Sequence, residues 1–271
     1  MEKTQVNIRI NELRGIINDA NRRYYVDNAP TLTDYEFDVL LKELEALENQ
    51  YPEFITPDSP TQKVGSDLKH SKASREGREF EQMPHRYPML SLGNTYDITE
   101  VEAFAERAEK GIGNAFTFCC ELKFDGTAIC LTYRNGKLLR ALTRGDGTVG
   151  YDVTRNVKHI HNIPQELKNG PWPEEFEIRG EIYMPWPAFD RLNEQRVKDE
   201  EQPFANPRNA ASGSLKLIDS KQVANRGLEC TLYHMLGEDL PFNTHKEALD
   251  KASQWGLPVS DKRMVSSRIE D

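Results

Sequence analysis

The sequence predicts an α+β protein in which a helical hairpin precedes an antiparallel-rich domain. Three observations predict this class. Apolar residues recur at spacings of three and four through the first part of the chain, which is the period of an amphipathic helix. Apolar segments of strand length follow from residue 116 onward. An Asn-Gly pair at residues 135–136 is a strong signal for the turn of a β-hairpin.

The helical hairpin is predicted within residues 1–68. Its first helix carries apolar residues at helical spacing, namely Val6, Ile10, Leu13, Ile17, Ala20 and Tyr24, and Asn-Ala-Pro at residues 28–30 ends it. The second helix begins at Thr33, because residues 33–36 fit the capping-box pattern. Its apolar face consists of Phe37, Leu40, Leu41, Leu44 and Leu47, and Tyr-Pro at 51–52 ends it. Residues 69–82, rich in charged side chains and serine, are expected to form an exposed connector.

A mixed pattern of helices and strands occupies the second predicted domain, residues 69–271. Asp97 is predicted to cap a helix that ends at Gly111 and Gly113. Strands are predicted at 116–122, 127–133, 137–143, 176–184 and 228–236, and two further helices at 187–198 and 244–255.

Composition excludes several function classes. The chain has 271 residues, with 35 Lys and Arg against 44 Asp and Glu and a formal net charge of −9. This acidic balance argues against a protein whose main task is to wrap a nucleic-acid backbone, but it leaves room for one local basic surface. No apolar run approaches the roughly 18 residues of a membrane span, and Met1 precedes a polar segment, so we expect a cytoplasmic protein with no membrane partner. Four cysteines without a C-x-x-C pair predict reduced thiols in or near the core.

The first candidate for chemistry is Lys123, in the segment Glu-Leu-Lys-Phe-Asp-Gly at residues 121–126. A lysine between two predicted strands and beside a tight Asp-Gly turn is well placed to face a cleft. Its amine becomes a nucleophile when it loses a proton, which burial or a neighbouring cation favours. Taken alone, the motif is better explained as a surface lysine beside an ordinary hairpin turn.

Three further segments accompany it. Residues 143–150 form a glycine-rich loop containing Arg144, suited to close approach of a phosphate or ribose, or simply a flexible loop. Glu177, Arg179 and Glu181 share one face of a predicted strand, which a solvated sheet face would also explain. Residues 204–216 surround Arg208 and Lys216 with small and amide residues, as expected of a phosphate-binding or a structural loop.

In this order, the four segments resemble the adenylation region of bacterial NAD-dependent DNA ligases. Pro-Met-Leu-Ser-Leu-Gly-Asn at residues 88–94 and the segment from Tyr24 to Asp38 match two further motifs of that family, so the resemblance runs nearly end to end. It implies that Lys123 attacks the α-phosphorus of NAD, forms lysyl-AMP and releases NMN. In the full enzyme the AMP would then pass to the 5′-phosphate of nicked double-stranded DNA.

The resemblance also assigns roles to single residues. Glu121 would read the adenine amino group. Ser91 and Leu92 would contact the nucleotide, and Arg144 and Glu181 the ribose and phosphate of AMP. Asp125 would act with Lys123 in catalysis by positioning the lysine or a magnesium (or manganese) ion, although no protein ligand set for a metal is evident. Arg208 and Lys216 would contact DNA or phosphate, and Lys216 stands where many members have Arg.

The helical hairpin would hold the NMN half of NAD. Tyr24 would stack on the nicotinamide, and Asp34 and Asp38 share a helix face where they would bind ribose hydroxyls or the carboxamide. The cofactor-binding set is Tyr24, Tyr25, Asp34, Tyr35, Glu36, Phe37 and Asp38. The plain alternative is that Tyr24 belongs to the core and Asp34 adds charge to a helix N-terminus. Tyr25 replaces a common His and Phe37 a common Tyr, and His159 and His161 are expected to be surface residues.

The sequence ends before the family's later lysine motifs, OB-fold, zinc module, helix-hairpin-helix repeats and BRCT domain. We therefore expect an N-terminal portion of a bacterial ligase that does not seal nicks alone, with zinc confined to the later module. Two alternatives stay open at this point. The chain could be a nucleotide-binding or docking fragment without turnover, or a nucleotidyltransferase that uses ATP or GTP, since such enzymes share the K-x-D-G lysine.

Overall fold

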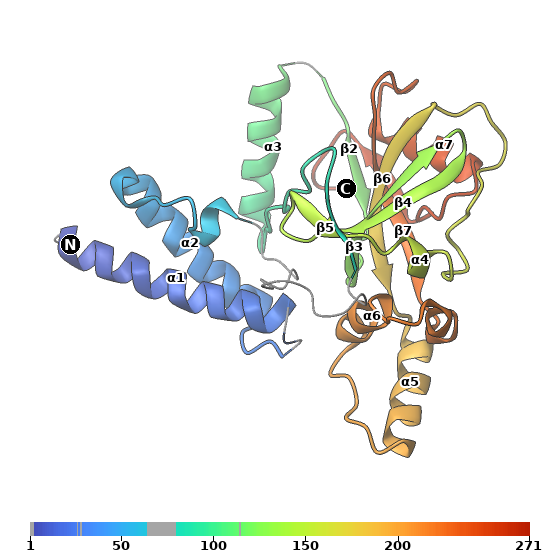
Figure 1. The fold of residues 1–271 in the computed structure, drawn as a ribbon. Helices are drawn as coiled ribbons and strands as arrows, with labels where there is room; N and C mark the ends of the chain where they lie inside the picture. Colours follow the sequence, from blue (N-terminus) through green and yellow to red (C-terminus); the bar gives the residue numbers. More distant parts are fainter. Residues whose placement is uncertain (1–2, 26, 28, 64–79, 114) are drawn as a thin grey trace. The chain divides into compact units, whose positions relative to one another are not determined.

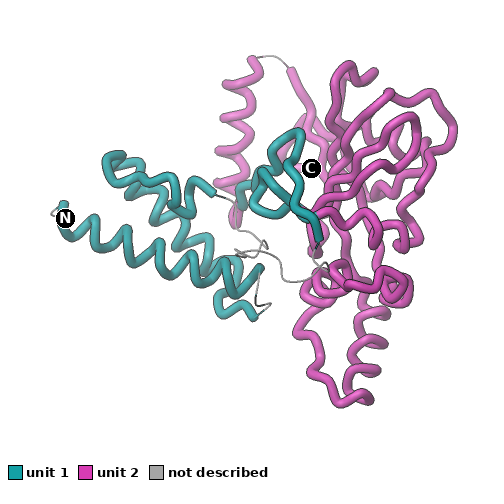
Figure 2. The backbone as a smooth tube through the Cα atoms, viewed as in Figure 1, with its two compact units in different colours: residues 1–94, 144–151 teal, residues 95–143, 152–271 magenta. Residues whose placement is uncertain are grey.

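A computed structural model describes residues 3–63, except 26 and 28, and residues 80–271, except 114. It confirms the α+β class, with an N-terminal pair of helices followed by antiparallel sheets (Figure 1). Among the described helices, none is long and apolar enough to cross a membrane. The chain divides into two compact units (Figure 2): a hairpin unit, Met1–Asn94 with Arg144–Tyr151, and a sheet unit, Thr95–Thr143 with Asp152–Asp271. The predicted boundary between residues 68 and 69 lies outside the described residues.

The hairpin unit is built on α1 (Lys3–Tyr25) and α2 (Asp34–Gln50). The predicted apolar faces pack against each other around Val6, Ile10, Leu13, Ile17 and Leu44. The predicted capping box is present: Thr33 Oγ1 accepts from the Glu36 N–H at 3.2 Å, and the Glu36 carboxylate accepts from the Thr33 N–H at 2.8 Å. Both helices therefore form where the local signals place them.

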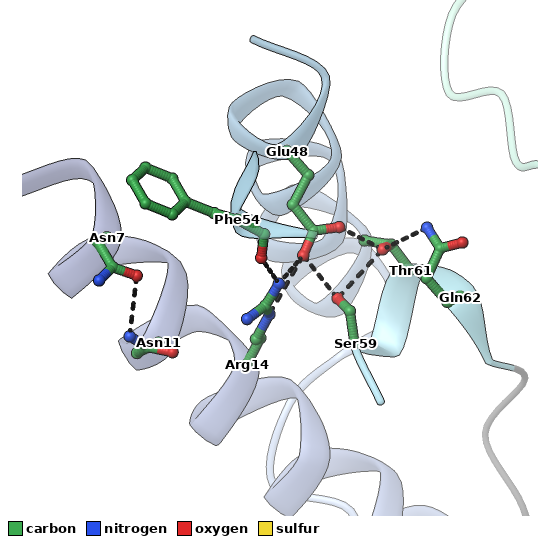
Figure 3. Close-up of polar contacts among 8 residues, drawn as sticks. All are labelled: Asn7, Asn11, Arg14, Glu48, Phe54, Ser59, Thr61 and Gln62. Atoms are coloured by element: carbon green, nitrogen blue, oxygen red, sulfur yellow. Dashed lines mark hydrogen bonds and ion pairs between the residues drawn. The ribbon is translucent and has the colours of Figure 1, made fainter. Parts of the chain in front are cut away.

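A buried carboxylate anchors the turn-rich segment that follows α2, which contains η1 (Pro52–Phe54) and η2 (Pro60–Gln62). Arg14, Ser59 and Thr61 converge on Glu48 (Figure 3), with Arg14 Nη2 at 2.5 Å and Ser59 Oγ at 2.7 Å from Oε1. Burial raises the pKa of Glu48, but hydrogen bonds from Thr61, Ser59 and Arg14 outweigh it, and the pKa lies below its ordinary value. The ionised carboxylate therefore ties this segment to both helices.

The hairpin unit also contains a strand pair that the sequence did not predict. β1 (Gln82–Pro84) runs antiparallel to β5 (Val149–Tyr151). The N–H of Met89 donates to the carbonyl of Gly147 at 2.8 Å and so continues the pairing into the glycine-rich segment. The Asp146 carboxylate accepts from the N–H groups of Thr148 and Val149. The predicted glycine-rich loop is therefore an ordered turn that leads into a strand.

The sheet unit is centred on a four-stranded antiparallel sheet of order β4-β3-β6-β7. Its strands are β3 (Thr127–Arg134), β4 (Lys137–Thr143), β6 (Glu175–Tyr183) and β7 (Glu229–Leu236). Asn135 and Gly136 connect β3 to β4 with φ values of 49° and 73°, as the two-residue hairpin turn requires. A second antiparallel pair joins the predicted β2 (Phe118–Glu121) to the unpredicted β8 (Arg263–Ser266).

Helices surround these sheets in the sheet unit. Three match the prediction: α3 (Ile98–Ile112) with Asp97 as its N-cap, α5 (Trp186–Lys198), and α7 (His245–Gln254) with Thr244 as its N-cap. The shorter α4 (Thr154–Val157) and η3 (Ser220–Arg226) were not predicted. The core includes an aromatic row in which Phe176 lies 5.6 Å from Tyr133 and 5.4 Å from Trp255, measured between ring centroids.

Several sequence expectations are wrong. Residues 207–215, predicted as part of a loop, form α6 (Pro207–Leu215). Asn206 caps this helix by accepting from the Asn209 N–H at 2.9 Å, and its small residues pack inside the unit. The alternative of a solvated face on β6 is also wrong, because Glu177 and Arg179 are buried. Cys130 and Cys230 are buried thiols as expected, but Cys120 is exposed.

Candidate functional site

Lys123 lies in the sheet unit on an exposed turn between β2 and β3. Gly126 closes this turn, and its N–H donates to Glu181 Oε1 of β6 at 3.1 Å. A Cβ at position 126 would stand 2.1 Å from the carbonyl oxygen of Ile182, so only glycine permits this approach to β6. The K-x-D-G segment is therefore held against the central sheet, with the lysine side chain left accessible.

A second cation lies beside this turn. Arg208 of α6 donates from Nη1 to Asp125 Oδ1 at 3.1 Å, and the Asp125 side chain remains 70% exposed. Burial lowers the pKa of Arg208 to about 10, which still leaves the guanidinium charged at neutral pH. The structure thus brings the predicted phosphate contact Arg208 to the predicted catalytic carboxylate. Lys216, the other predicted phosphate contact, is the C-cap residue of the same helix and is partly buried.

Glu121 precedes the lysine by two residues and has a partner from a distant part of the chain. Its Oε1 lies 2.6 Å from Nε2 of His245, the first residue of α7. Cys119 Sγ lies 3.7 Å from the same oxygen. Sequence reasoning missed His245, because nothing around the start of a predicted helix marks a histidine as a partner of a strand 124 residues away.

Charged groups also line the buried face of β6. Cys130 Sγ donates to Glu177 Oε2 at 3.3 Å, and burial together with the Glu177 charge raises the pKa of Cys130 to about 12. Arg179 is in register with His234 of β7. Burial, Arg179 and His245 lower the pKa of His234. Through Arg179, His234 and His245, these contacts link β6, the strand that carries Glu181, to Glu121.

The hairpin unit holds the other predicted site residues. The Arg144 guanidinium lies 5.2 Å from the centroid of the Tyr25 ring, a cation–π geometry, and Tyr25 meets Tyr24 edge to face at 4.8 Å. Asn94 donates to Asp38 Oδ2 at 2.6 Å. Two predicted motifs, the glycine-rich turn and residues 88–94, therefore contact the helices within this unit. Asn94 is the last residue of the predicted motif at residues 88–94, but only the structure identifies it as a partner of Asp38.

The remaining predicted residues of the hairpin unit differ in their surroundings. Asp34, Tyr35, Ser91 and Leu92 are exposed, and Leu92 is 81% exposed. Glu36 uses its carboxylate in the capping box, and Phe37 packs against the helical core. Solvent reaches these exposed side chains, whereas Glu36 and Phe37 serve the fold.

The structure thus gathers the predicted residues into two groups, one in each unit. The sheet unit holds Lys123, Asp125, Glu121, Glu181, Arg208 and Lys216, and the hairpin unit holds Tyr24, Tyr25, residues 34–38, Ser91, Leu92 and Arg144. His159 is partly buried and His161 exposed, in keeping with ordinary surface histidines.

Comparison with known protein families identifies the chain. Residues 77–271 match the family described as the NAD-dependent DNA ligase adenylation domain. The chain belongs to this family. Residues 3–65, which include both helices of the hairpin unit, match the family described as the DNA ligase-like, N-terminal NAD+-binding domain. The NAD+-binding match precedes the adenylation-domain match along the chain, as the order of the six sequence motifs predicted.

Individual relatives agree with this assignment. The chain is 50% identical over 266 residues to a DNA ligase of Parabacteroides distasonis, covering 98% of this chain and 39% of that protein. It is 52% identical over 253 residues to a DNA ligase of Phocaeicola vulgatus, covering 93% and 37%. It is 43% identical over 271 residues to a DNA ligase of Cytophaga hutchinsonii, covering 100% and 39%. The chain therefore spans about two fifths of the length of these relatives.

Proposed function

We propose that this chain carries the adenylation half-reaction of an NAD-dependent DNA ligase. The neutral Lys123 amine attacks the α-phosphorus of NAD, and a P–N bond forms as the P–O bond of the pyrophosphate breaks. NMN leaves with that oxygen, and the lysine nitrogen releases one proton to solvent. The observation that carries the proposal is the turn of residues 123–126, held to β6 through Gly126 and Glu181 in a member of the adenylation domain family. A lysine presented on a rigid turn suits in-line attack, because the nucleophile is oriented before the substrate arrives.

The surrounding charges suit this chemistry. Negative charge grows on the phosphate oxygens as the lysine attacks, and the Arg208 guanidinium beside the turn would stabilise it. The Asp125–Arg208 ion pair orients that guanidinium. Arg208 and Lys216 would contact phosphate or DNA, Glu121 would read the adenine amino group, and Glu181 would contact the AMP ribose or phosphate.

A magnesium or manganese ion fits the residues present. Asp125 is largely exposed, and its carboxylate supplies the hard oxygen ligand that Mg²⁺ prefers. When bound, such an ion would neutralise charge on the pyrophosphate. The Asp125 carboxylate would help to hold it, while Arg208 provides a positive charge beside the same turn.

We further propose that the two domains act on different parts of NAD. Residues 1–68 would recognise the NMN half of NAD, and residues 69–271 would transfer the adenylyl group. The exposed carboxylate of Asp34 and the Asp38 carboxylate would bind ribose hydroxyls or the carboxamide. Tyr25 under the Arg144 guanidinium, with Tyr24 beside it, would form an aromatic surface for the nicotinamide. Ser91 and Leu92 would contact the nucleotide from the neighbouring segment.

The decisive experiment is an intact-mass measurement of the protein before and after incubation with NAD and magnesium. We expect the mass of one adenylyl group to be added to the wild-type chain and not to Lys123→Ala. Lys137→Ala is the matched control, because Lys137 is an exposed lysine on β4. An adduct that persists in Lys123→Ala would overturn the assignment of the nucleophile. Complete absence of an adduct on the wild-type chain would favour nucleotide binding without turnover.

The longer relatives are DNA ligases, so we propose that the AMP on Lys123 is destined for the 5′-phosphate of nicked double-stranded DNA. The chain alone is expected to stop at lysyl-AMP. Incubation of the adenylated protein with nicked duplex tests this, because appearance of sealed strands at rates comparable to those of a full ligase would contradict it.

A further inference from the structure

Three side chains in the sheet unit direct metal-binding atoms toward one point. Cys119 Sγ, Glu121 Oε1 and His245 Nε2 all lie within 4.8 Å of one another. The oxygen stands 2.6 Å from the imidazole nitrogen and 3.7 Å from the sulfur. Of these three residues, the proposed adenylation reaction uses only Glu121. It therefore does not explain why a thiol and an imidazole lie beside that carboxylate.

Regular secondary structure holds all three residues. Cys119 and Glu121 are two apart on β2 and therefore lie on the same face of the strand, which β8 pairs along its whole length. His245 is the first residue of α7, whose start is determined by the capping box of Thr244 and Glu247. Ligands carried on a paired strand and on a capped helix are positioned more accurately than ligands on a loop.

The donor set selects the class of ion. Thiolate, imidazole and carboxylate are the three ligand types of Zn²⁺ sites, whereas Mg²⁺ favours oxygen alone. Ligand atoms of a tetrahedral Zn²⁺ site lie roughly 2.0–2.3 Å from the metal and therefore roughly 3.5 Å from one another. The 3.7 Å between Cys119 Sγ and Glu121 Oε1 matches this spacing, whereas Glu121 Oε1 and His245 Nε2, now 2.6 Å apart, would move apart as the ion replaces their hydrogen bond. We propose that Cys119, Glu121 and His245 bind a thiophilic divalent cation of the Zn²⁺ class, with the fourth position left to water.

Binding requires a change of protonation that the surroundings influence. The Cys119 thiol gives its proton to the solvent, and neutral His245 offers the Nε2 lone pair, so one proton is released for each ion bound. Burial and Glu121 raise the pKa of Cys119, while Arg263 opposes them. Arg263 is in register with Glu121 and donates to Asp250 at 3.0 Å, and His234 lies 6.2 Å from the His245 ring.

The position of the site has a consequence that rests on the proposed function. Glu121 is the residue expected to read the adenine amino group, and a bound ion occupies the carboxylate oxygen that would accept from it. A cation of the Zn²⁺ class should therefore compete with NAD. The role proposed for magnesium is different, because that ion would neutralise charge on the pyrophosphate of NAD and so favour the same reaction.

The binding experiment uses the whole chain without NAD. Co²⁺ serves as the probe, because a thiolate ligand gives it a charge-transfer absorption band, and Zn²⁺ is then titrated to displace it. We expect the band in the wild type and its loss in Cys119→Ala and Cys119→Ser. Affinity should fall more than about 100-fold in His245→Ala, since loss of even an outer partner of a metal ligand costs about 10–100-fold.

Two control variants make this test specific. Cys120→Ala removes the neighbouring exposed thiol on the opposite face of β2, and His161→Ala removes an exposed histidine outside the cluster. Both should bind Co²⁺ like the wild type. A wild-type titration without a thiolate band, or loss of the band in Cys120→Ala but not in Cys119→Ala, would overturn the site.

A competition experiment separates the site from the proposed function. Zn²⁺ should slow lysyl-AMP formation in the wild type and in Cys120→Ala, but not in Cys119→Ala, each compared with the same variant without zinc. Equal inhibition of Cys119→Ala would refute competition through this site. If no variant forms lysyl-AMP, the proposed function fails, while the Co²⁺ titration still decides whether the metal site exists.

Discussion

The two units differ in how far along the chain their key polar contacts reach. In the hairpin unit, Glu48 is held by Ser59 and Thr61, 11 and 13 residues away, and by Arg14, 34 residues away. In the sheet unit, Asp125 meets Arg208 across 83 residues and Glu121 meets His245 across 124. The packing of α1, α2 and the segment after them is therefore specified by nearby sequence. The candidate chemistry of the sheet unit is assembled from distant segments, as is the contact of Arg144 with Tyr25 in the hairpin unit.

The exposure of the key side chains also differs between the two units. Glu48, the central polar group of the hairpin unit, is only 2% exposed and makes all its contacts inside the protein. Lys123 and Asp125 in the sheet unit are exposed. A buried and fully paired carboxylate contributes to stability, whereas an exposed lysine on a rigid turn is available to a substrate. Substitutions in the two units should consequently affect different measurements.

The largest expected effect concerns the exposed acidic face of α2. Replacing Asp34 and Asp38 together by Ala should reduce lysyl-AMP formation from NAD by about a hundredfold or more, because each hydrogen bond to a charged group contributes about 1.5–3 kcal/mol. The rate is measured from adduct mass against time at limiting NAD. Glu45→Ala, an exposed carboxylate elsewhere on α2, is the matched control. An unchanged rate in the double variant would remove the hairpin from NAD recognition.

Glu48→Ala tests the structural role of the hairpin unit. The variant leaves the partly buried Arg14 guanidinium without its buried carboxylate partner, and losing one partner of a buried pair costs up to about 3–5 kcal/mol. Far-UV circular dichroism in a urea titration follows the helices. Fluorescence reports the sheet unit, because Trp172, Trp186 and Trp255 all lie there. We expect an early loss of helical signal. Simultaneous loss of both signals would show that the two units unfold as one.

Arg208→Met tests whether the sheet unit uses its long-range ion pair in chemistry. Removing a preorganised group that stabilises developing charge typically lowers a rate by about 10²–10³-fold. We expect a fall of this order in lysyl-AMP formation, with a smaller effect from Lys216→Met on the same helix. Melting temperature is recorded beside the rate, since an equally large loss of stability would mean that Arg208 serves the fold instead.

The pH dependence of the hairpin unit follows from Glu48. Its folded-state pKa lies below the ordinary value, so the stability it contributes is complete above the unfolded pKa of about 4.3 and is lost as the pH falls through the folded pKa. An acid titration of the far-UV signal should show this loss, and Glu48→Gln should weaken the dependence. An identical acid profile for both proteins would rule out Glu48 as its source.

The smallest expected effect is at the helix cap. Thr33→Ala removes the side chain that accepts from the Glu36 N–H and should destabilise the hairpin unit by about 1 kcal/mol. Urea unfolding followed by circular dichroism measures this, with Thr31→Ala, outside the helix, as the control. Because the Glu36 carboxylate is engaged in the cap, the rate of lysyl-AMP formation from NAD should fall no more than the loss of folded protein explains. A larger fall in that rate would instead indicate that Glu36 contacts the nucleotide.

Local signals in the sequence predict much of this fold. Helical periodicity places α1 and α2, Thr33 and Asp97 cap their helices as predicted, and Asn135-Gly136 turns β3 into β4. Each of these signals acts within a few residues, so no distant partner is needed to recognise it. The six ordered motifs likewise identify the family from the sequence before any contact is known.

Only the tertiary structure decides the features that depend on distant partners. β1 and β8 are too short to carry a periodic pattern and exist because β5 and β2 pair with them. α6 looks like a loop in sequence because its residues are small, yet burial of those residues favours a helix. The contacts of Arg208 with Asp125 and of His245 with Glu121 leave no local trace. The sequence by itself determined the longer helices and the main strands and singled out Lys123 as the candidate nucleophile, whereas packing decided which side chains surround it, because that choice depends on residues brought together only by folding.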